Sequence, residues 1–264
     1  MNHRQILDKL TIGPQVACLD AELRTLVFQA RCFARHGSIG GELPWILQRL
    51  EARWGCVPRD DTGVHYHRQI TLAKAVLLHK YGYAEERLTR EAVDAVALLN
   101  ERVVLGDAFF RQQDDINAFL GSAPVPLNRN PPQSASVPFY LAADVIAIGF
   151  GGLFLAAYVH RIVPLNKEPI IELYDAVFSV PPELKELERC PAFGQPSKNG
   201  PVTKRLLSVA HLTYLPDPSG QVSLVAACVE TPPDDSALEP SRGLYTVSDI
   251  FSIQRELAAL LERH

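Results

Sequence analysis

A proline-rich stretch near the middle of the sequence separates two regions with different residue patterns. Residues 121–138 contain five prolines and no periodic spacing of apolar side chains. Proline lacks a backbone N–H donor and disfavours helix in the residue before it. We therefore predict a linker at 121–138 between a helical domain at 1–120 and a smaller domain at 139–264. The alternative is a long surface loop inside one compact domain.

The region before this stretch shows apolar side chains at helical spacing. Asp20 and Thr89 are predicted to cap two of its helices, because a short polar side chain can accept from the backbone of the first turn. Each apolar stripe covers only one face, so the helices must pack on one another as a bundle. The predicted helices cover residues 20–37, 44–55, 69–80, 89–103 and 108–120.

The region after the stretch is mixed. Segments 205–214 and 221–229 are rich in strand-forming residues and flank the turn sequence 216–220, which predicts a β-hairpin. Residues 231–243 read as an acidic, proline-containing loop. Thr246 and Asp249 have the spacing of a capping box at the start of a C-terminal helix. The predicted fold class is α+β and mostly helical, with an N-terminal helical bundle followed by a smaller mixed domain.

Composition excludes several classes of protein. With 47% hydrophobic and 21% charged residues the chain can bury a core, and a net charge of -4 gives no global case for binding nucleic acid or an anionic membrane. Residues 145–159 are uncharged, but about 15 residues fall short of the ~20 needed to span a membrane. We expect a buried core element there.

The cysteines indicate a reducing compartment. They are odd in number and scattered, with no spacing typical of a disulfide framework or a zinc finger. The charged N-terminus also lacks the apolar stretch of a signal peptide, so we expect a cytoplasmic protein. The abundance of arginine and alanine suggests a bacterial source. The cysteines are Cys18, Cys32, Cys56, Cys190 and Cys228.

A glycine-rich segment is the sharpest candidate for a binding site. Gly149, Gly151 and Gly152 follow an apolar run, and Glu172 ends a second one about 20 residues later. This pattern resembles the start of the dinucleotide-binding βαβ unit of flavoproteins. The resemblance implies that the glycines approach the pyrophosphate of FAD or NAD and that Glu172 accepts from a ribose hydroxyl. The alternative is one buried helix over 139–162.

Other polar residues are candidates for catalytic or metal-binding groups. His65 and His67, near Asp60, Asp61 and Cys56, would share a face only in an extended segment, and no third ligand follows. The pair Asp114–Asp115 is expected on a solvated helix face. Cys228 and His211 would meet only across the predicted hairpin, and small buried cysteines are the commoner case. The sequence therefore predicts no metal site and no cofactor.

Two arginines are candidate contacts for nucleic acid. Arg49 and Arg53 lie along one predicted helix with Gln48, an arrangement suited to the second helix of a helix-turn-helix. The alternative is that the N-terminal arginines pair with nearby acids such as Glu51.

The functional expectation follows mainly from the absence of recognisable catalytic motifs in the sequence. The sequence has neither a nucleophile elbow nor a phosphate-binding loop. We expect a non-enzymatic interaction or assembly subunit of a bacterial cytoplasmic complex, with other protein subunits as partners and no membrane contact. Dinucleotide binding at 149–154 and DNA binding by the N-terminal helices are the alternatives.

Overall fold

The chain divides into two compact units in the computed structural model. Unit 1 comprises Met1–Leu47 and Val57–Ser134, and unit 2 comprises Gln48–Cys56 and Ala135–His264. The structure describes residues 1–55, 61–101, 104–132, 140–164, 167–197, 200–210, 212, 217, 219–241 and 243–261.

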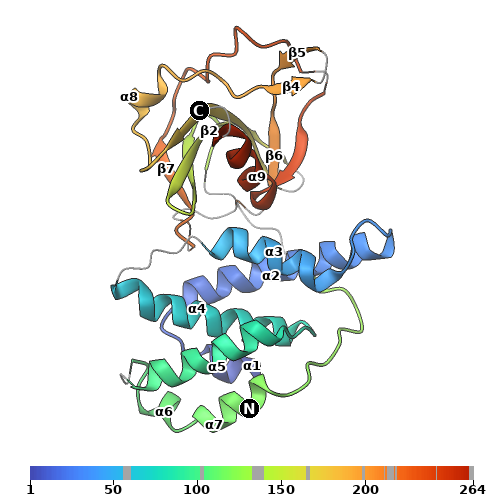
Figure 1. The fold of residues 1–264 in the computed structure, drawn as a ribbon, viewed down its shortest axis with the longest axis vertical. Helices are drawn as coiled ribbons and strands as arrows, with labels where there is room; N and C mark the ends of the chain where they lie inside the picture. The colour runs from blue at the N-terminus through green and yellow to red at the C-terminus, as the bar shows by residue number, and fades with distance from the viewer. Residues whose placement is uncertain are drawn as a thin grey trace. The chain divides into compact units, whose positions relative to one another are not determined.

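Unit 1 is helical (Figure 1), as the apolar stripes predict. Helix α4 is its centre, because it packs against α1, α2, α5 and α7. Apolar side chains such as Leu23, Val27, Ile70 and Val76 are fully buried between these helices. The helices are α1 (His3–Leu7), α2 (Gly13–Arg35), α3 (Glu42–Trp54), α4 (Asp61–Lys80), α5 (Glu86–Glu101), α6 (Asp107–Phe110) and α7 (Gln113–Leu120).

Two predicted helix starts are wrong. Helix α2 begins seven residues before Asp20, with Pro14 in its first turn. The Asp20 carboxylate instead accepts from the Lys80 ammonium at 2.7 Å and from the Tyr81 hydroxyl at 2.9 Å. Thr89 lies inside α5, where the Glu85 side chain accepts from the first turn. A polar residue at a plausible cap position is also a plausible partner for a distant cation, and the local pattern does not separate the two.

Unit 2 is built on a mixed six-stranded sheet with the order β7-β1-β2-β3-β6-β8. Neighbouring strands are antiparallel except for β6 and β8. The strands are β1 (Val145–Phe150), β2 (Leu153–Ile162), β3 (Pro169–Phe178), β6 (Leu207–Ala210), β7 (Val222–Ala226) and β8 (Thr246–Asp249). A separate pair is formed by β4 (Gln195–Ser197) and β5 (Gly200–Thr203), and the helices are α8 (Leu184–Leu187) and α9 (Ile250–Leu261).

The predicted fold class is therefore wrong in calling the protein mostly helical. The structure is 43% helix and 21% strand, and the sheet dominates unit 2. The uncharged run 145–159 caused the error, because an apolar run of this length suits either a buried helix or buried strands. It forms β1 and most of β2.

The predicted hairpin of 205–214 with 221–229 is also wrong. Strand β6 lies between β3 and β8, while β7 pairs with β1. Strands β1 and β2 form a tight hairpin, whose turn residues Gly151 and Gly152 have φ of 59° and 89°. Two successive positive φ values match the twist of a two-residue hairpin, and glycine adopts them without strain.

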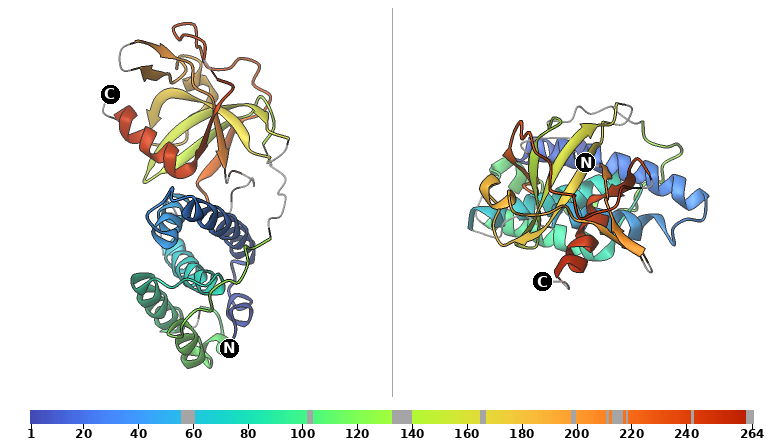
Figure 2. Two further views of the ribbon diagram at one scale, coloured as in Figure 1. Left: turned by 90° about the vertical axis from the view of Figure 1, so that its right-hand side faces the viewer. Right: turned by 90° about the horizontal axis from the view of Figure 1, so that it is seen from above.

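The sheet of unit 2 is covered on both faces. Helix α9 lies across one face (Figure 2), where Ile253 and Leu257 pack with Ile171 and Leu173 of β3. The other face buries a smaller cluster that contains Val145, Ala156, Tyr158, Tyr174 and Leu187.

The C-terminal helix begins later than the capping-box spacing predicts. Asp249 is its cap, since its carboxylate accepts from the Ser252 backbone N–H at 2.7 Å. Thr246 lies in β8 and pairs with Leu207. The apolar side chains of this helix are buried at Ile250, Ile253 and Leu257, whereas Leu261 is about half exposed.

Replacing the second turn glycine tests the β1–β2 hairpin. We expect Gly152→Ala to lower the free energy of unfolding by about 1–2 kcal/mol, because an alanine is strained at positive φ. Urea denaturation of the full chain measures this, with Gly243→Ala as the matched control in an open loop without positive φ. An equal loss of unfolding free energy in both variants would contradict a positive φ at Gly152.

Candidate ligand-binding groove

The glycine segment does not form a strand, turn and helix. Gly151 and Gly152 make the β1–β2 turn, and a strand follows them where the dinucleotide interpretation requires a helix. Gly149 lies within β1 opposite Phe154, whose ring would be 3.0 Å from a Cβ at this position. The predicted βαβ unit and the alternative of one helix over 139–162 are both wrong for this segment. A glycine turn after an apolar run fits a hairpin equally well.

Glu172 lies in the middle of β3 and is fully buried. Its carboxylate accepts from His160 Nε2 at 2.7 Å and lies 3.3 Å from Lys204 Nζ. Lys204 also forms an ion pair with Asp235 at 2.5 Å. Glu172 therefore belongs to a chain of charged groups within unit 2, away from the three glycines with which it was grouped.

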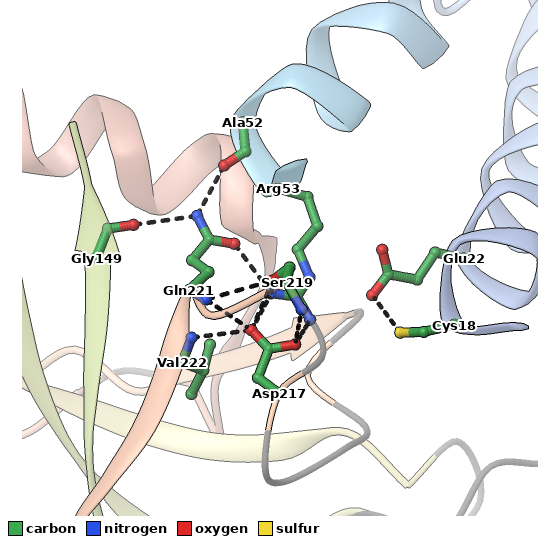
Figure 3. A network of polar contacts seen from close by, with 9 residues as sticks. All are labelled: Cys18, Glu22, Ala52, Arg53, Gly149, Asp217, Ser219, Gln221 and Val222. Atoms are coloured by element: carbon green, nitrogen blue, oxygen red, sulfur yellow. Dashed lines mark hydrogen bonds and ion pairs between the residues drawn. The ribbon is translucent and has the colours of Figure 1, made fainter. Parts of the chain in front are cut away.

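The two arginines proposed for nucleic acid are engaged inside unit 2, and Figure 3 shows the contacts of Arg53. Arg53 is only 4% exposed, and its Nη2 lies 2.5 Å from Asp217 Oδ1. Arg49 forms an ion pair with Asp249 at 2.8 Å and lies over the ring of Phe251. Both guanidinium groups therefore serve the packing of residues 48–56 on the rest of unit 2. The sequence alone could not distinguish arginines in buried ion pairs from arginines on a basic surface, because the acidic partners lie about 160 to 200 positions away.

The Asp217 carboxylate organises the chain that enters β7. It accepts from the backbone N–H groups of Gln221 at 3.0 Å and Val222 at 2.9 Å, besides Arg53 and the Ser219 hydroxyl. Burial alone would raise the pKa of Asp217, but Arg53 and these donors outweigh it and hold the pKa below its ordinary value. The charged form is thus favoured in the native state.

Gln221 extends this network to two further segments. Its side-chain amide donates to the carbonyl of Ala52 at 2.7 Å and to that of Gly149 at 3.2 Å. Helix α3, strand β1 and the start of β7 are therefore joined through one buried polar cluster. Its groups are satisfied by one another, so the cluster is a structural element and not a binding site.

The metal-site candidates do not come together. His65 and His67 lie two positions apart in α4, so they point in different directions. Asp114 and Asp115 are exposed in the first turn of α7. Asp60 and Cys56 lie outside the described residues, as does His211 of the proposed pair with Cys228. Within the described ranges no three His, Cys, Asp or Glu side chains form a group suited to a metal ion.

An open groove of about 810 Å³ lies in unit 2. Tyr174 of β3 lines it from the sheet face opposite α9, and the segment 184–190 with α8 forms one side. The other side is the chain that leaves β7, residues 227–235, which we call the wall segment. The groove combines Tyr174 and residues 184–190 with the wall segment about 40 positions later in the sequence, so no local motif predicts it.

Both ends of the wall segment are fixed. At its start, Val229 donates its N–H to the Ala143 carbonyl at 2.7 Å and accepts from the Tyr158 hydroxyl at 3.0 Å. At its end, the Asp234 carbonyl accepts from Ala192 N–H at 2.8 Å, and Lys204 holds Asp235. The groove is therefore shaped before any ligand arrives.

The groove is acidic. Its described lining includes four carboxylates and no Lys, Arg or His side chain. Asp235 is paired with Lys204, whereas Glu188, Glu230 and Asp234 form no ion pair with any described residue. The N–H of Ser236 donates to Asp234 and lowers its pKa, so that this carboxylate stays charged at neutral pH. The apolar part of the lining consists of Leu184, Leu187, Ala227, Val229, Pro232 and Pro233.

Tyr174 is the polar group at the base of the groove. It is only 3% exposed, and its hydroxyl has no hydrogen-bond partner within the described part of the chain. Burial raises the pKa of Tyr174 to about 12, with smaller contributions from Tyr158, Cys190 and Glu172. The group is therefore a neutral hydroxyl that is ready to donate.

Two thiols also line the groove. Burial raises the pKa of Cys190, and Glu186 and Asp175 raise it further, so the thiol is not activated as a nucleophile. Cys228 is exposed in the wall segment, with φ of 56°. The chemistry of the lining thus favours binding a positively charged ligand over covalent catalysis.

The comparisons with known proteins supply no functional residues. No known protein family matches the chain, and no curated protein or solved structure matches it either. No described helix has the length and apolar character to cross a membrane.

Removing the charge of Asp217 tests the buried cluster. We expect Asp217→Asn to lower the free energy of unfolding by about 3–5 kcal/mol, since Arg53 is left buried without a counter-charge. Asp249→Asn is the control at the more exposed pair and should cost about 1 kcal/mol or less. Urea denaturation measures both, and similar losses would argue against a special role for Asp217.

The same carboxylate predicts how stability depends on pH. Its pKa in the folded state lies below the ordinary value of 3.8, so its stabilisation is present above that pH and is lost as the pH falls through the folded value. The wild-type chain should therefore lose more stability below pH ~4 than the Asp217→Asn variant does. Unfolding free energies measured from pH 6 down to about 2.5 test this, and parallel profiles would refute it.

Proposed function

We propose that the chain is a non-enzymatic interaction or assembly subunit of a bacterial cytoplasmic complex, and that the groove of unit 2 holds a segment of a partner protein. The groove carries this proposal. It combines a fixed wall segment, the Tyr174 hydroxyl and three carboxylates that form no ion pair with any described residue.

A groove with these properties is suited to binding. Its volume of about 810 Å³ falls within the range of roughly 300–1,000 Å³ typical of ligand sites. A wall held at Val229 and Asp235 need not be ordered when the ligand binds, which reduces the entropy lost on association. These features support recognition of a partner.

The chemistry of the titratable groups supports a binding role over a catalytic one. Glu188, Glu230 and Asp234 are exposed carboxylates, and the Cys190 thiol is held protonated. The buried acids Asp217 and Glu172 are committed to ion pairs with Arg53 and Lys204. Within the described part of the chain Cys18, Cys32, Cys190 and Cys228 form no disulfide, which is consistent with a reducing cytoplasm.

A charge reversal on the wall segment tests this function. We expect the Glu230→Lys, Asp234→Lys double variant to retain at least tenfold less partner protein than wild type in quantitative affinity capture from the native cells. Both residues are exposed, so the fold should tolerate the change. The matched control is Asp114→Lys, Asp115→Lys on the exposed start of α7 in unit 1, which should retain the partner.

Three readouts decide the matter. The thermal unfolding midpoint should be similar in the wild type and in both double variants, which shows that any loss of partner is local. A partner that is retained equally by the wall-segment variant and by the control would refute binding at the groove. A wild-type chain that captures no stoichiometric protein would refute the assembly function itself.

A further inference from the structure

We infer that the occupant of the groove is an extended, basic peptide: a segment of a partner protein whose lysine or arginine side chains alternate with apolar residues. This inference rests on the proposed function and specifies the ligand. Its basis is the match between the chemistry of such a peptide and three features of the lining, namely separated carboxylates, the Tyr174 hydroxyl and apolar walls.

The carboxylates require more than one positive charge. Glu188 follows α8 on one side of the groove, whereas Glu230 and Asp234 lie four positions apart on the wall segment. A single ammonium group would leave some of these carboxylates without a partner. Several cationic side chains spaced along one chain can neutralise them together.

The hydroxyl of Tyr174 can donate to an acceptor in the ligand. Its proton is retained at neutral pH, and no described residue accepts it. A peptide supplies acceptors in its backbone carbonyls, whereas the ammonium groups of a free polyamine only donate. This feature favours a peptide over a small polyamine of the same charge.

The apolar lining suits the rest of such a peptide. Leu184 and Leu187 offer apolar surface on one side, and Pro232 and Pro233 do so on the other. Lysine and arginine pack their aliphatic stems on apolar surface and keep their charges at the rim. The two prolines lack N–H groups, so they place no backbone donor in this part of the wall.

The test measures binding of a defined peptide to the full-length chain. The probe is a fluorescently labelled 12-residue peptide of alternating lysine and leucine, and fluorescence anisotropy reports its dissociation constant. The reference peptide carries glutamate in place of lysine. We expect the lysine peptide to bind at least tenfold more tightly than the reference peptide.

Variants locate the binding. The triple variant Glu188→Gln, Glu230→Gln, Asp234→Asn should raise the dissociation constant of the lysine peptide at least tenfold. The matched control Asp114→Asn, Asp115→Asn, which removes charges from α7 of unit 1, should leave binding within twofold of wild type. Tyr174→Phe should weaken binding three- to tenfold, because only the hydroxyl is removed. Thermal unfolding of each variant shows whether it is folded.

The remaining outcomes overturn the inference in distinguishable ways. Equal weakening by the α7 control would show unspecific attraction to an acidic protein. Displacement of the peptide by spermine at equal charge concentration, with no effect of Tyr174→Phe, would identify a polyamine site. Absence of peptide binding would refute the basic peptide. The proposed function would then still stand if the wall-segment charge reversal abolished capture of the natural partner.

Discussion

The buried ion pair of Arg53 and Asp217 is the interaction on which unit 2 depends. The same carboxylate that binds the guanidinium also accepts from the backbone at the start of β7, so the pair sets where this strand begins. Strand β7 then pairs with β1, and the chain that leaves it becomes the wall segment. The groove is therefore shaped, through one strand, by a charge pair in the protein interior.

A second buried carboxylate acts at the far end of the wall segment. Glu172 lies close to Lys204, and Lys204 holds Asp235. The wall is thus positioned at its start through Asp217 and β7, and at its end through Glu172. Buried acids of this kind stabilise a particular arrangement because each is costly to leave without its partner. The groove inherits its shape from them, while its exposed carboxylates remain available to a ligand.

Local patterns predicted part of this molecule well. The apolar stripes of unit 1 report on each helix separately, so its helical character follows from the sequence. The strands were harder, because the run 145–159 and the pair Gly151–Gly152 fit more than one structure. The pairing of β7 with β1 joins segments about 75 positions apart, which turn signals cannot reveal. The burial of Arg53 and the groove around Tyr174 likewise depend on contacts between distant segments.

The division of α3 between the two units has a consequence for how the protein is made. Residues 48–56 belong to unit 2, yet Asp217 follows Arg53 by 164 positions. At a typical synthesis rate, Arg53 leaves the ribosome roughly 8 to 33 seconds before its partner. During that interval the helix carries an unpaired guanidinium that is destined for the interior. Unit 2 can complete its fold only after β7 has been translated, so the rate of synthesis limits when the Arg53–Asp217 ion pair forms.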